Sequence, residues 1–300
     1  MRVYKHYFAA FAAFFIWGFF SLALKPLANY SSLDILFYRI FFSVAIMGLL
    51  NVFFRPKNLK ENWTTFTLLS NQQKKKSILL TIIGSILISL NWFVFIYVVN
   101  HVSLKAASLA YMICPILTTV FAFFILKEKL SKWQWFAVLV SCLGCGLLAI
   151  NHLEDLFFSF IVAATYALYL ISQRNNNHID KFLSLSIQLT IVAFLILPFY
   201  PNYRGDVPVS AMFYIYLLII VLFFTITPLF LNLYALKGIN SSTVGILMYI
   251  NPIINFSIAV FIYNETVTLL QVVSYFLIFL AILIFNEKLL FPKQNSYFDK

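Results

Sequence analysis

Long apolar runs separated by short polar stretches make up most of the chain. Each run approaches or exceeds the roughly 20 residues with which a helix crosses a hydrocarbon core of about 30 Å. The pattern shows no short alternating strands with turn residues, which a transmembrane barrel would require. Backbone groups in lipid must form hydrogen bonds within their own segment. The pattern of apolar runs therefore predicts an all-α membrane protein with ten transmembrane helices. These spans are expected at residues 8–28, 34–54, 77–99, 105–126, 132–150, 155–173, 182–200, 211–235, 241–263 and 267–286.

The composition agrees with this pattern. Hydrophobic residues make up 62% of the chain and charged residues 10%, and the mean hydropathy is +0.91. Soluble domains carry about 25% charged residues. The N-terminus has the basic start and apolar core of a signal peptide, but no small-x-small cleavage site follows, so we expect it to remain as the first span.

One apolar segment occurs twice. Residues 97–128 match residues 234–265 without a gap at an offset of 137, and eight of the 32 positions are identical. Each copy has a proline near its middle, Pro115 or Pro252, and ends in a glutamate. Chance similarity between two apolar helices explains shared Ile and Phe but not the common Pro-to-Glu spacing. A duplicated, proline-interrupted membrane helix indicates a transport site between two repeats.

The duplication predicts two five-helix repeats, residues 1–150 and residues 151–300. Five is an odd number, so the second repeat must be inverted in the membrane relative to the first. Weaker similarity among the first helices of each repeat pairs Trp17 with Tyr166 and Arg39 with Gln188.

The distribution of basic residues predicts the orientation. The net charge is +11. With the N-terminus in the cytoplasm, seventeen Lys and Arg fall on the inner side and three on the outer side, with Arg39 left inside a span. This bias predicts a multi-pass protein of the plasma (inner) membrane with both termini cytoplasmic. The basic balance therefore reflects topology and anionic inner-leaflet lipid, and no nucleic-acid partner is expected.

Polar and aromatic residues at mid-span depth identify a candidate cavity, because polar groups there cost free energy unless they are paired or hydrated. Each central proline also removes a donor, so the carbonyls of Tyr111 and Met248 are expected to lack their helical partner. We expect the substrate between the two proline helices. The expected cavity residues are Trp17, Arg39, Asn91, Trp92, Tyr111, Pro115, Tyr249, Asn251 and Pro252.

Three of these residues have alternative roles. Asn91 and Asn251 offer donors and acceptors for a polar substrate group, or they simply bridge helices at about 0.6 kcal/mol per bond. Arg39 is the one charged residue well inside an expected span. It either contacts substrate near the outer side or reaches outward to bond loop carbonyls or Asp34.

Catalytic and metal chemistry has little support. No Asp, Glu or His lies deep in an expected span, so we expect no enzyme activity, catalytic residue, metal or cofactor. The Cys142-x-x-Cys145 spacing sits in a run of small residues, which favours close helix packing over a redox or metal site. Glu128 and Glu265 stand at the ends of the proline helices and are expected to be structural, not proton-coupling.

Four stretches together resemble a known family: DILFYRIFFS, SLNWFVFIYVVNHVSLKAASLAYMICP, KEKLSKWQW and TPLFLNLYALKGINSSTVGILMYINP. They are similar to the RarD-type branch of the EamA family in the drug/metabolite transporter superfamily. The resemblance implies ten helices in two inverted halves, alternating access and a central cavity. The usual Gly-Tyr-Phe-Ile-Asn-Pro motif is altered at Ala110–Pro115, whereas Asn251-Pro252 keeps its Asn.

These observations favour a carrier that moves a small organic metabolite or drug, most simply outward. Two antiparallel halves offer inward-open and outward-open states of similar energy, which suits a transport cycle. The alternative is a membrane receptor or lipid-handling protein without such a cycle. The expected partners are a small-molecule substrate and the lipid bilayer; the sequence identifies no substrate, indicates no proton coupling and leaves a homodimer open.

Overall fold

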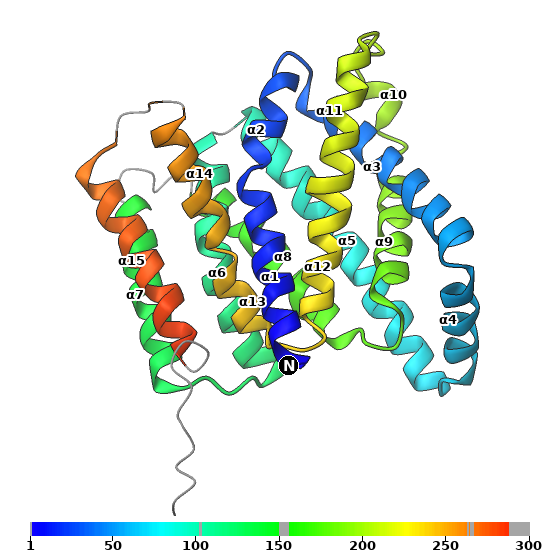
Figure 1. Ribbon diagram of the computed structural model, residues 1–300, viewed down its shortest axis with the longest axis horizontal. Coiled ribbons are helices and arrows are strands. Elements are labelled where there is room, and N and C mark those ends of the chain that lie inside the picture. The colour runs from blue at the N-terminus through cyan, green and yellow to red at the C-terminus, as the bar shows by residue number, and fades with distance from the viewer. Residues whose placement is uncertain (1, 102–103, 150–155, 263, 265–266, 288–300) are drawn as a thin grey trace, which may run out of the picture.

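A computed structural model describes residues 2–101, 104–149, 156–262, 264 and 267–287, and within these ranges the chain is helical with no β-strand (Figure 1). Segments η2 and η4 are π-helical turns, and η1 is a 3₁₀ turn. In chain order the helices are α1 (Arg2–Gly18), α2 (Phe20–Leu24), η1 (Lys25–Leu27), α3 (Ser32–Leu49), η2 (Leu50–Phe54), α4 (Pro56–Leu68), α5 (Asn71–His101), α6 (Leu104–Leu126), α7 (Lys132–Ala149), α8 (Leu156–Asn175), α9 (Lys181–Ile196), α10 (Tyr200–Tyr203), α11 (Ala211–Val221), η4 (Leu222–Ile226), α12 (Thr227–Ala235), α13 (Ser241–Leu247), α14 (Ile250–Phe261) and α15 (Leu269–Phe285).

The helices confirm the predicted class, an all-α membrane protein. Among the described residues, seven helical segments are long and apolar enough to cross a membrane, and α1 with α2, bent by 41°, makes an eighth. The other two expected spans correspond to α9 and α15, apolar helices of 16 and 17 residues. By length alone the structure thus supports seven or eight crossings, because α9 and α15 are shorter than the roughly 20 residues that a span needs.

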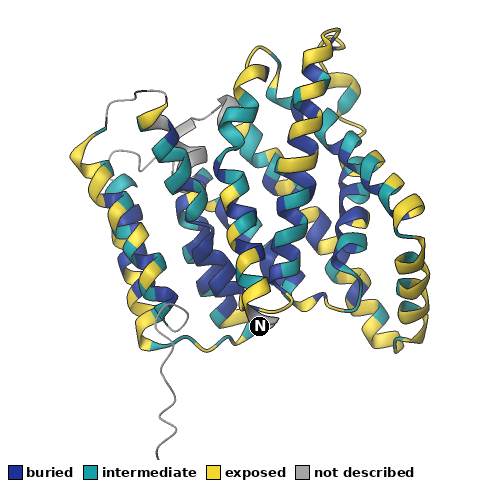
Figure 2. Ribbon diagram, viewed as in Figure 1, coloured by how far each residue is buried: buried dark blue, intermediate teal, exposed yellow. Residues whose placement is uncertain are grey.

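The bundle has a buried middle and apolar outer faces. Helix α6 packs against α8, α1 packs against α12 and α14, and α7 packs against α15. Figure 2 shows buried residues concentrated in the central helices and exposed residues on the outward sides of α4, α7 and α15. Large apolar side chains such as Phe8, Leu143 and Phe276 are exposed. Apolar surface on this scale is typical of contact with lipid.

Close packing of α7 on α15 explains the small residues around the Cys142-x-x-Cys145 stretch. A Cβ placed on Gly144 would lie 3.0 Å from the backbone oxygen of Ser274. Cys142 and Cys145 are both free thiols. The structure therefore confirms the close helix packing that was predicted for this stretch.

The duplication extends to backbone geometry at the helix ends. Among the described residues, the non-glycine positions with positive φ are Lys127 (57°) and Asn264 (51°), which are equivalent at the repeat offset. A capping box then begins the next helix at equivalent positions in each copy. The paired residues are Ser131 with Gln134 for α7 and Thr268 with Gln271 for α15. The helix after each proline segment is therefore started by the same bonds.

Candidate functional site

The two proline segments have different backbones. Helix α6 continues through Pro115, whereas the second copy is divided between α13 and α14 ahead of Pro252. At the division, the amide of Asn251 donates to the carbonyl of Met248 at 3.1 Å. The expectation that this carbonyl lacks a partner is therefore wrong, because a tighter turn supplies a donor from three residues on instead of four.

Side chains engage the polar groups around the proline of α6. The thiol of Cys145 on α7 donates to the carbonyl of Met112 at 3.2 Å. The hydroxyl of Thr119 donates to the carbonyl of Pro115 at 2.9 Å. Neither bond involves the carbonyl of Tyr111, whose expected loss of its helical partner stays a prediction.

Trp17 satisfies a carbonyl that another proline has left without a donor. Its indole Nε1 donates to the carbonyl of Phe224 at 2.9 Å. Four residues after Phe224 comes Pro228, which has no N–H to donate back, and the chain widens there into the π turn η4. The bond ties α1 to the start of α12, so Trp17 positions helices as well as lining the centre.

Arg39 lies among aromatic rings, and no acid in the described part of the chain forms an ion pair with it. Its guanidinium carbon is 4.8 Å from the centre of the Trp92 ring and 5.7 Å from that of Phe20. Its Nε is enclosed and has no hydrogen-bond partner. Asp34 instead accepts from the amide of Gly205 at 2.9 Å. The Asp34 partnership considered for Arg39 is therefore not formed.

Tyr111 lies within electrostatic range of Arg39. Tyr111 is exposed, with 39% of its surface accessible. Its ring meets that of Phe95 edge to face at 5.5 Å.

Tyr166 joins this group from the second half of the chain. Its ring faces Trp17 edge-on at 6.4 Å, and its hydroxyl accepts from the amide of Asn232 at 3.0 Å. The carbonyl oxygen of Asn232 is buried without a partner. The name central cluster is used below for Trp17, Phe20, Arg39, Trp92, Tyr111 and Tyr166.

The two candidate asparagines have different surroundings. Asn91 is buried, and its amide donates to the carbonyl of Val162 at 2.7 Å and to the hydroxyl of Thr165 at 3.1 Å, both on α8. These bonds favour the helix-bridging role. Asn251 is half-buried and accepts from Asn255 at 2.6 Å within α14.

The remaining candidates lie elsewhere. Tyr249 is fully buried in a second apolar cluster with α7 and α15, where its hydroxyl is 3.6 Å from the Cys145 sulfur. Pro115 and Pro252 are buried in the backbone of their helices. The structure thus brings Trp17, Arg39, Trp92 and Tyr111 together and places Tyr249 apart from them.

Sequence reasoning missed Phe20, Tyr166 and Asn232 as members or neighbours of the site. Tyr166 could have been found, because it is the repeat counterpart of Trp17 and the two rings face each other across the bundle. Phe20 and Asn232 gave no such signal.

A carboxylate clasp joins the two proline segments. Glu128, just after α6, accepts from the amides of Ser241 and Ser242 at 2.7 and 3.1 Å and from the Ser242 hydroxyl at 2.6 Å. The end of α6 thus meets the start of α13, and the two helices run in opposite directions (Figure 1). Glu128 bonds backbone amides, as predicted, but these begin the partner helix and do not end its own; that it does not couple protons stays a prediction. Glu265 lies outside the described residues.

A second polar network holds α8 to α9. Gln188 donates to the side-chain oxygen of Gln173 at 2.6 Å and accepts from the hydroxyl of Tyr169 at 3.1 Å. The ammonium of Lys181, at the start of α9, donates to the carbonyl of Gln173 at 2.9 Å. Burial, together with neighbouring basic groups, lowers the pKa of Lys181 to about 7. This part of the bundle is closed by hydrogen bonds between side chains.

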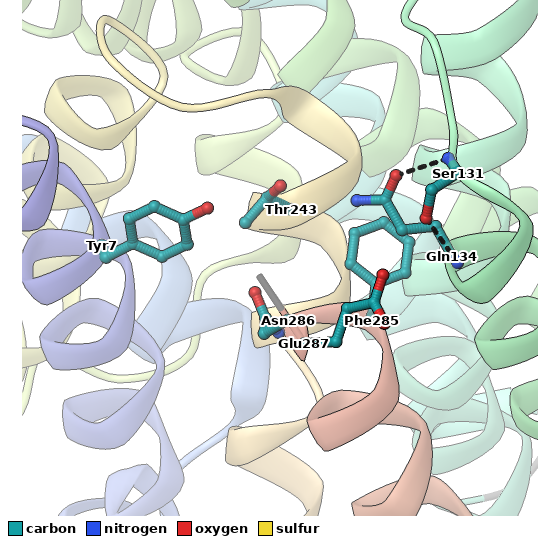
Figure 3. A pocket seen from close by; sticks show the side chains of 7 residues that line it. All are labelled: Tyr7, Ser131, Gln134, Thr243, Phe285, Asn286 and Glu287. Atoms are coloured by element: carbon teal, nitrogen blue, oxygen red, sulfur yellow. Dashed lines mark hydrogen bonds between the residues drawn. The ribbon is translucent and has the colours of Figure 1, made fainter. Parts of the chain in front are cut away.

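Figure 3 shows a separate small hollow between α1, α7, α13 and α15. Its volume is about 60 Å³. A water molecule takes about 30 Å³, whereas sites for organic ligands are typically about 300–1,000 Å³. The hollow suits one or two waters, not a substrate. It is lined by Tyr7, Ser131, Gln134, Thr243, Phe285, Asn286 and Glu287.

Comparisons with known proteins agree with this architecture. The model of the EamA-like transporter family matches residues 5–150 and again residues 154–286. The uncharacterized transporter YojE of Bacillus subtilis is 33% identical over 280 residues, covering 91% of each chain. Protein RarD of Escherichia coli is 28% identical over 295 residues, covering 96% of this chain and 95% of that protein.

One solved structure, described only as a crystal structure of protein, aligns with a TM-score of 0.73. The alignment covers 94% of this chain and 96% of that one at 14% sequence identity. This likeness concerns the fold alone.

Proposed function

The chain belongs to the EamA-like transporter family, and from this premise we propose that it exports a small organic solute across the inner membrane by alternating access. As a membrane transporter of the drug/metabolite superfamily, it needs a binding site reachable from each side in turn. In this proposal the repeats, residues 1–150 and 151–300, are the two moving halves. The resemblance to RarD-type proteins supports the same interpretation.

The observation that carries the proposal is the central cluster. Its residues come from α1, α2, α3, α5, α6 and α8, so both halves of the chain contribute. A charged side chain deep among aromatic rings is costly in a membrane protein and typically marks a substrate or ion pathway. Trp92, Arg39 and Tyr111 form the core of the proposed site, and Trp17 is its wall. Asn251 and the two prolines are proposed to shape it from α6 and α14.

The position of the Glu128 clasp supports a proposal for which end of the bundle opens toward the cytoplasm. The start of α1 and the end of α15 lie at the same end of the bundle as the clasp (Figure 1). The excess of basic residues there supports a cytoplasmic location for this end and for both termini. In the proposed cycle, the clasp between Glu128 and Ser242 opens when the inner side opens, and α14 moves about the division ahead of Pro252.

A cross-linking experiment tests this cycle. In a chain with its three cysteines replaced by alanine, the pair Glu128→Cys and Ser242→Cys is treated with a short thiol cross-linker in reconstituted vesicles. Exchange of radiolabelled solutes should stop on cross-linking and return after reductive cleavage. The single variants with the same reagent are the controls. Unchanged exchange by a fully cross-linked pair would show that this end does not open during transport.

The same vesicles separate a transporter from a receptor. A solute that stabilises the purified protein yet never exchanges across the vesicle membrane would favour a receptor or lipid-handling role. A proton-coupled carrier should concentrate the solute when a proton gradient is imposed, so equal net uptake with and without the gradient would argue against coupling to protons.

A further inference from the structure

We propose that the central cluster recognises the carboxylate of an organic monoanion with an apolar body, and that Arg39 binds this carboxylate. The inference rests on the proposed transport function, whose site it specifies.

The first argument is the unpaired charge. Arg39 contacts the Trp92 and Phe20 rings, and its enclosed Nε has no acceptor. A buried donor without a partner is rare in native proteins and calls for an explanation such as a missing ligand. For a guanidinium inside a membrane protein the need is greater, because arginine stays charged.

The second argument is that three of the described acids, including the one on the helix of Arg39, have other partners. Asp34, five residues before Arg39 on the same helix, is bonded to Gly205. Asp180 forms an ion pair with Arg55 at 3.0 Å, and Glu128 caps α13. Of the described acids, none forms an ion pair with Arg39. Because no described carboxylate balances this charge, we assign the counter-charge to a bound ligand.

The third argument concerns the shape of the ligand. A guanidinium stacked on a ring presents its N–H groups at its edge, where two of them match the two oxygens of a carboxylate. One arginine balances one negative charge, which favours a monoanion. The surrounding rings of Phe20, Trp92, Tyr111 and Tyr166 offer flat apolar contact for the rest of the molecule.

The experiment compares acids with their neutral amides. Purified full-length protein in detergent is heated with 3-phenylpropionate or 3-phenylpropanamide, and with hexanoate or hexanamide, and the unfolding temperature is recorded against concentration. We expect the acids to stabilise the wild-type protein at concentrations about 10- to 100-fold lower than the amides, since a charge-assisted bidentate pair is lost in the amide. This comparison needs no variant.

Variants then locate the effect. Arg39→Gln should raise the acid concentration needed by a similar factor while leaving the amide response unchanged, and Arg39→Lys should restore part of the preference. Arg204→Gln is the matched control, because Arg204 is exposed and also stacks on a ring, that of Tyr200, at 5.8 Å.

Several outcomes would overturn the assignment. These are equal stabilisation by acid and amide, an acid preference that persists in folded Arg39→Gln protein, absence of stabilisation by every acid, and equal stabilisation by chloride or phosphate. Solute exchange in vesicles distinguishes failure of the carboxylate site from failure of the transport proposal. Exchange of amides but not acids would leave a transporter without the carboxylate site, whereas acid binding without exchange would leave the site and remove the transport function.

Discussion

The two copies of the proline segment lie against each other, yet one is a continuous helix and the other is divided. Helix α6 is continuous through Pro115, while α13 and α14 meet at a turn just before Pro252. Both prolines remove the same backbone donor. The comparison teaches that a proline permits a joint but the neighbouring helices decide whether one forms.

The hydrogen bonds beside the two prolines also differ. Beside Pro115, the thiol of Cys145 reaches across from α7 to the carbonyl of Met112. Beside Pro252, the chain tightens until Asn251 bonds the carbonyl of Met248. We therefore expect α6 to act as a fixed support and α14 to move on it.

The largest effect is expected from a substitution at the contact between the two copies. A Cβ on Gly245 of α13 would lie 2.8 Å from the Cβ of Thr118 and 3.3 Å from the carbonyl oxygen of Pro115. Gly245→Val should therefore lower the free energy of unfolding by about 1–3 kcal/mol, measured by thermal unfolding in detergent. Gly146→Val is the control, because nothing lies within 4 Å of its Cβ position. Equal tolerance of both variants would mean that α6 and α13 are not in tight contact.

The second test removes the clasp at the end of α6. Glu128→Ala leaves the amides of Ser241 and Ser242 without their acceptor, and should cost about 1–2 kcal/mol of stability. Glu128→Gln should recover part of this loss, because an amide oxygen still accepts a hydrogen bond. Glu61→Gln, at an exposed carboxylate on α4, should change nothing measurable. A loss for Glu61→Gln as large as that for Glu128→Gln would point to a general charge effect.

The third test exchanges the prolines themselves. Pro252→Ala lets α13 and α14 approach one continuous helix, so we expect solute exchange in vesicles to slow about threefold to tenfold, or ~0.7–1.4 kcal/mol in barrier. Pro115→Ala, in a helix that is already continuous, should change the rate less than twofold. If Pro115→Ala slows exchange more than Pro252→Ala does, the joint is in the other copy.

The smallest test removes the bond that supports α6. Cys145→Ala takes away the donor to Met112 and should cost about 0.5–1 kcal/mol, seen as a modest fall in unfolding temperature. Cys142→Ala is matched in chemistry but exposed, so no loss is expected. Identical behaviour of the two variants would contradict a structural role for the Cys145 thiol.

The sequence predicted the class of fold because span length is set by membrane thickness and shows directly in the apolar runs. It also predicted that Trp17, Arg39, Trp92 and Tyr111 would share one region, because polar and aromatic groups at mid-depth are expected to face the interior of the bundle. It did not predict the partner of Trp17. The sequence does show that Pro228 leaves the carbonyl of Phe224 without a donor, but the donor is 207 residues away.

The misplaced expectations have a common cause. Tyr249 sits one position from Ile250 at the start of α14, so the turn ahead of that helix decides which way its ring points. The same turn supplies the partner of the Met248 carbonyl. The equivalent segment of α6 shares only the Ile and the Pro of this stretch, and no such turn forms there. Side-chain directions beside a helix break therefore depend on contacts far along the chain.

The clasp also sets an order of events during biosynthesis. Glu128 and Ser241 are separated by 113 residues, and ribosomes add about 5–20 residues per second. For about 6–23 seconds at that rate, Glu128 has been made but the amides of α13 that donate to it have not. The segment that ends at Glu128 is therefore made before α13, and its carboxylate is hydrated or bound elsewhere during that time. Formation of the hydrogen bonds between Glu128 and α13 then marks the packing of α13 against the end of α6.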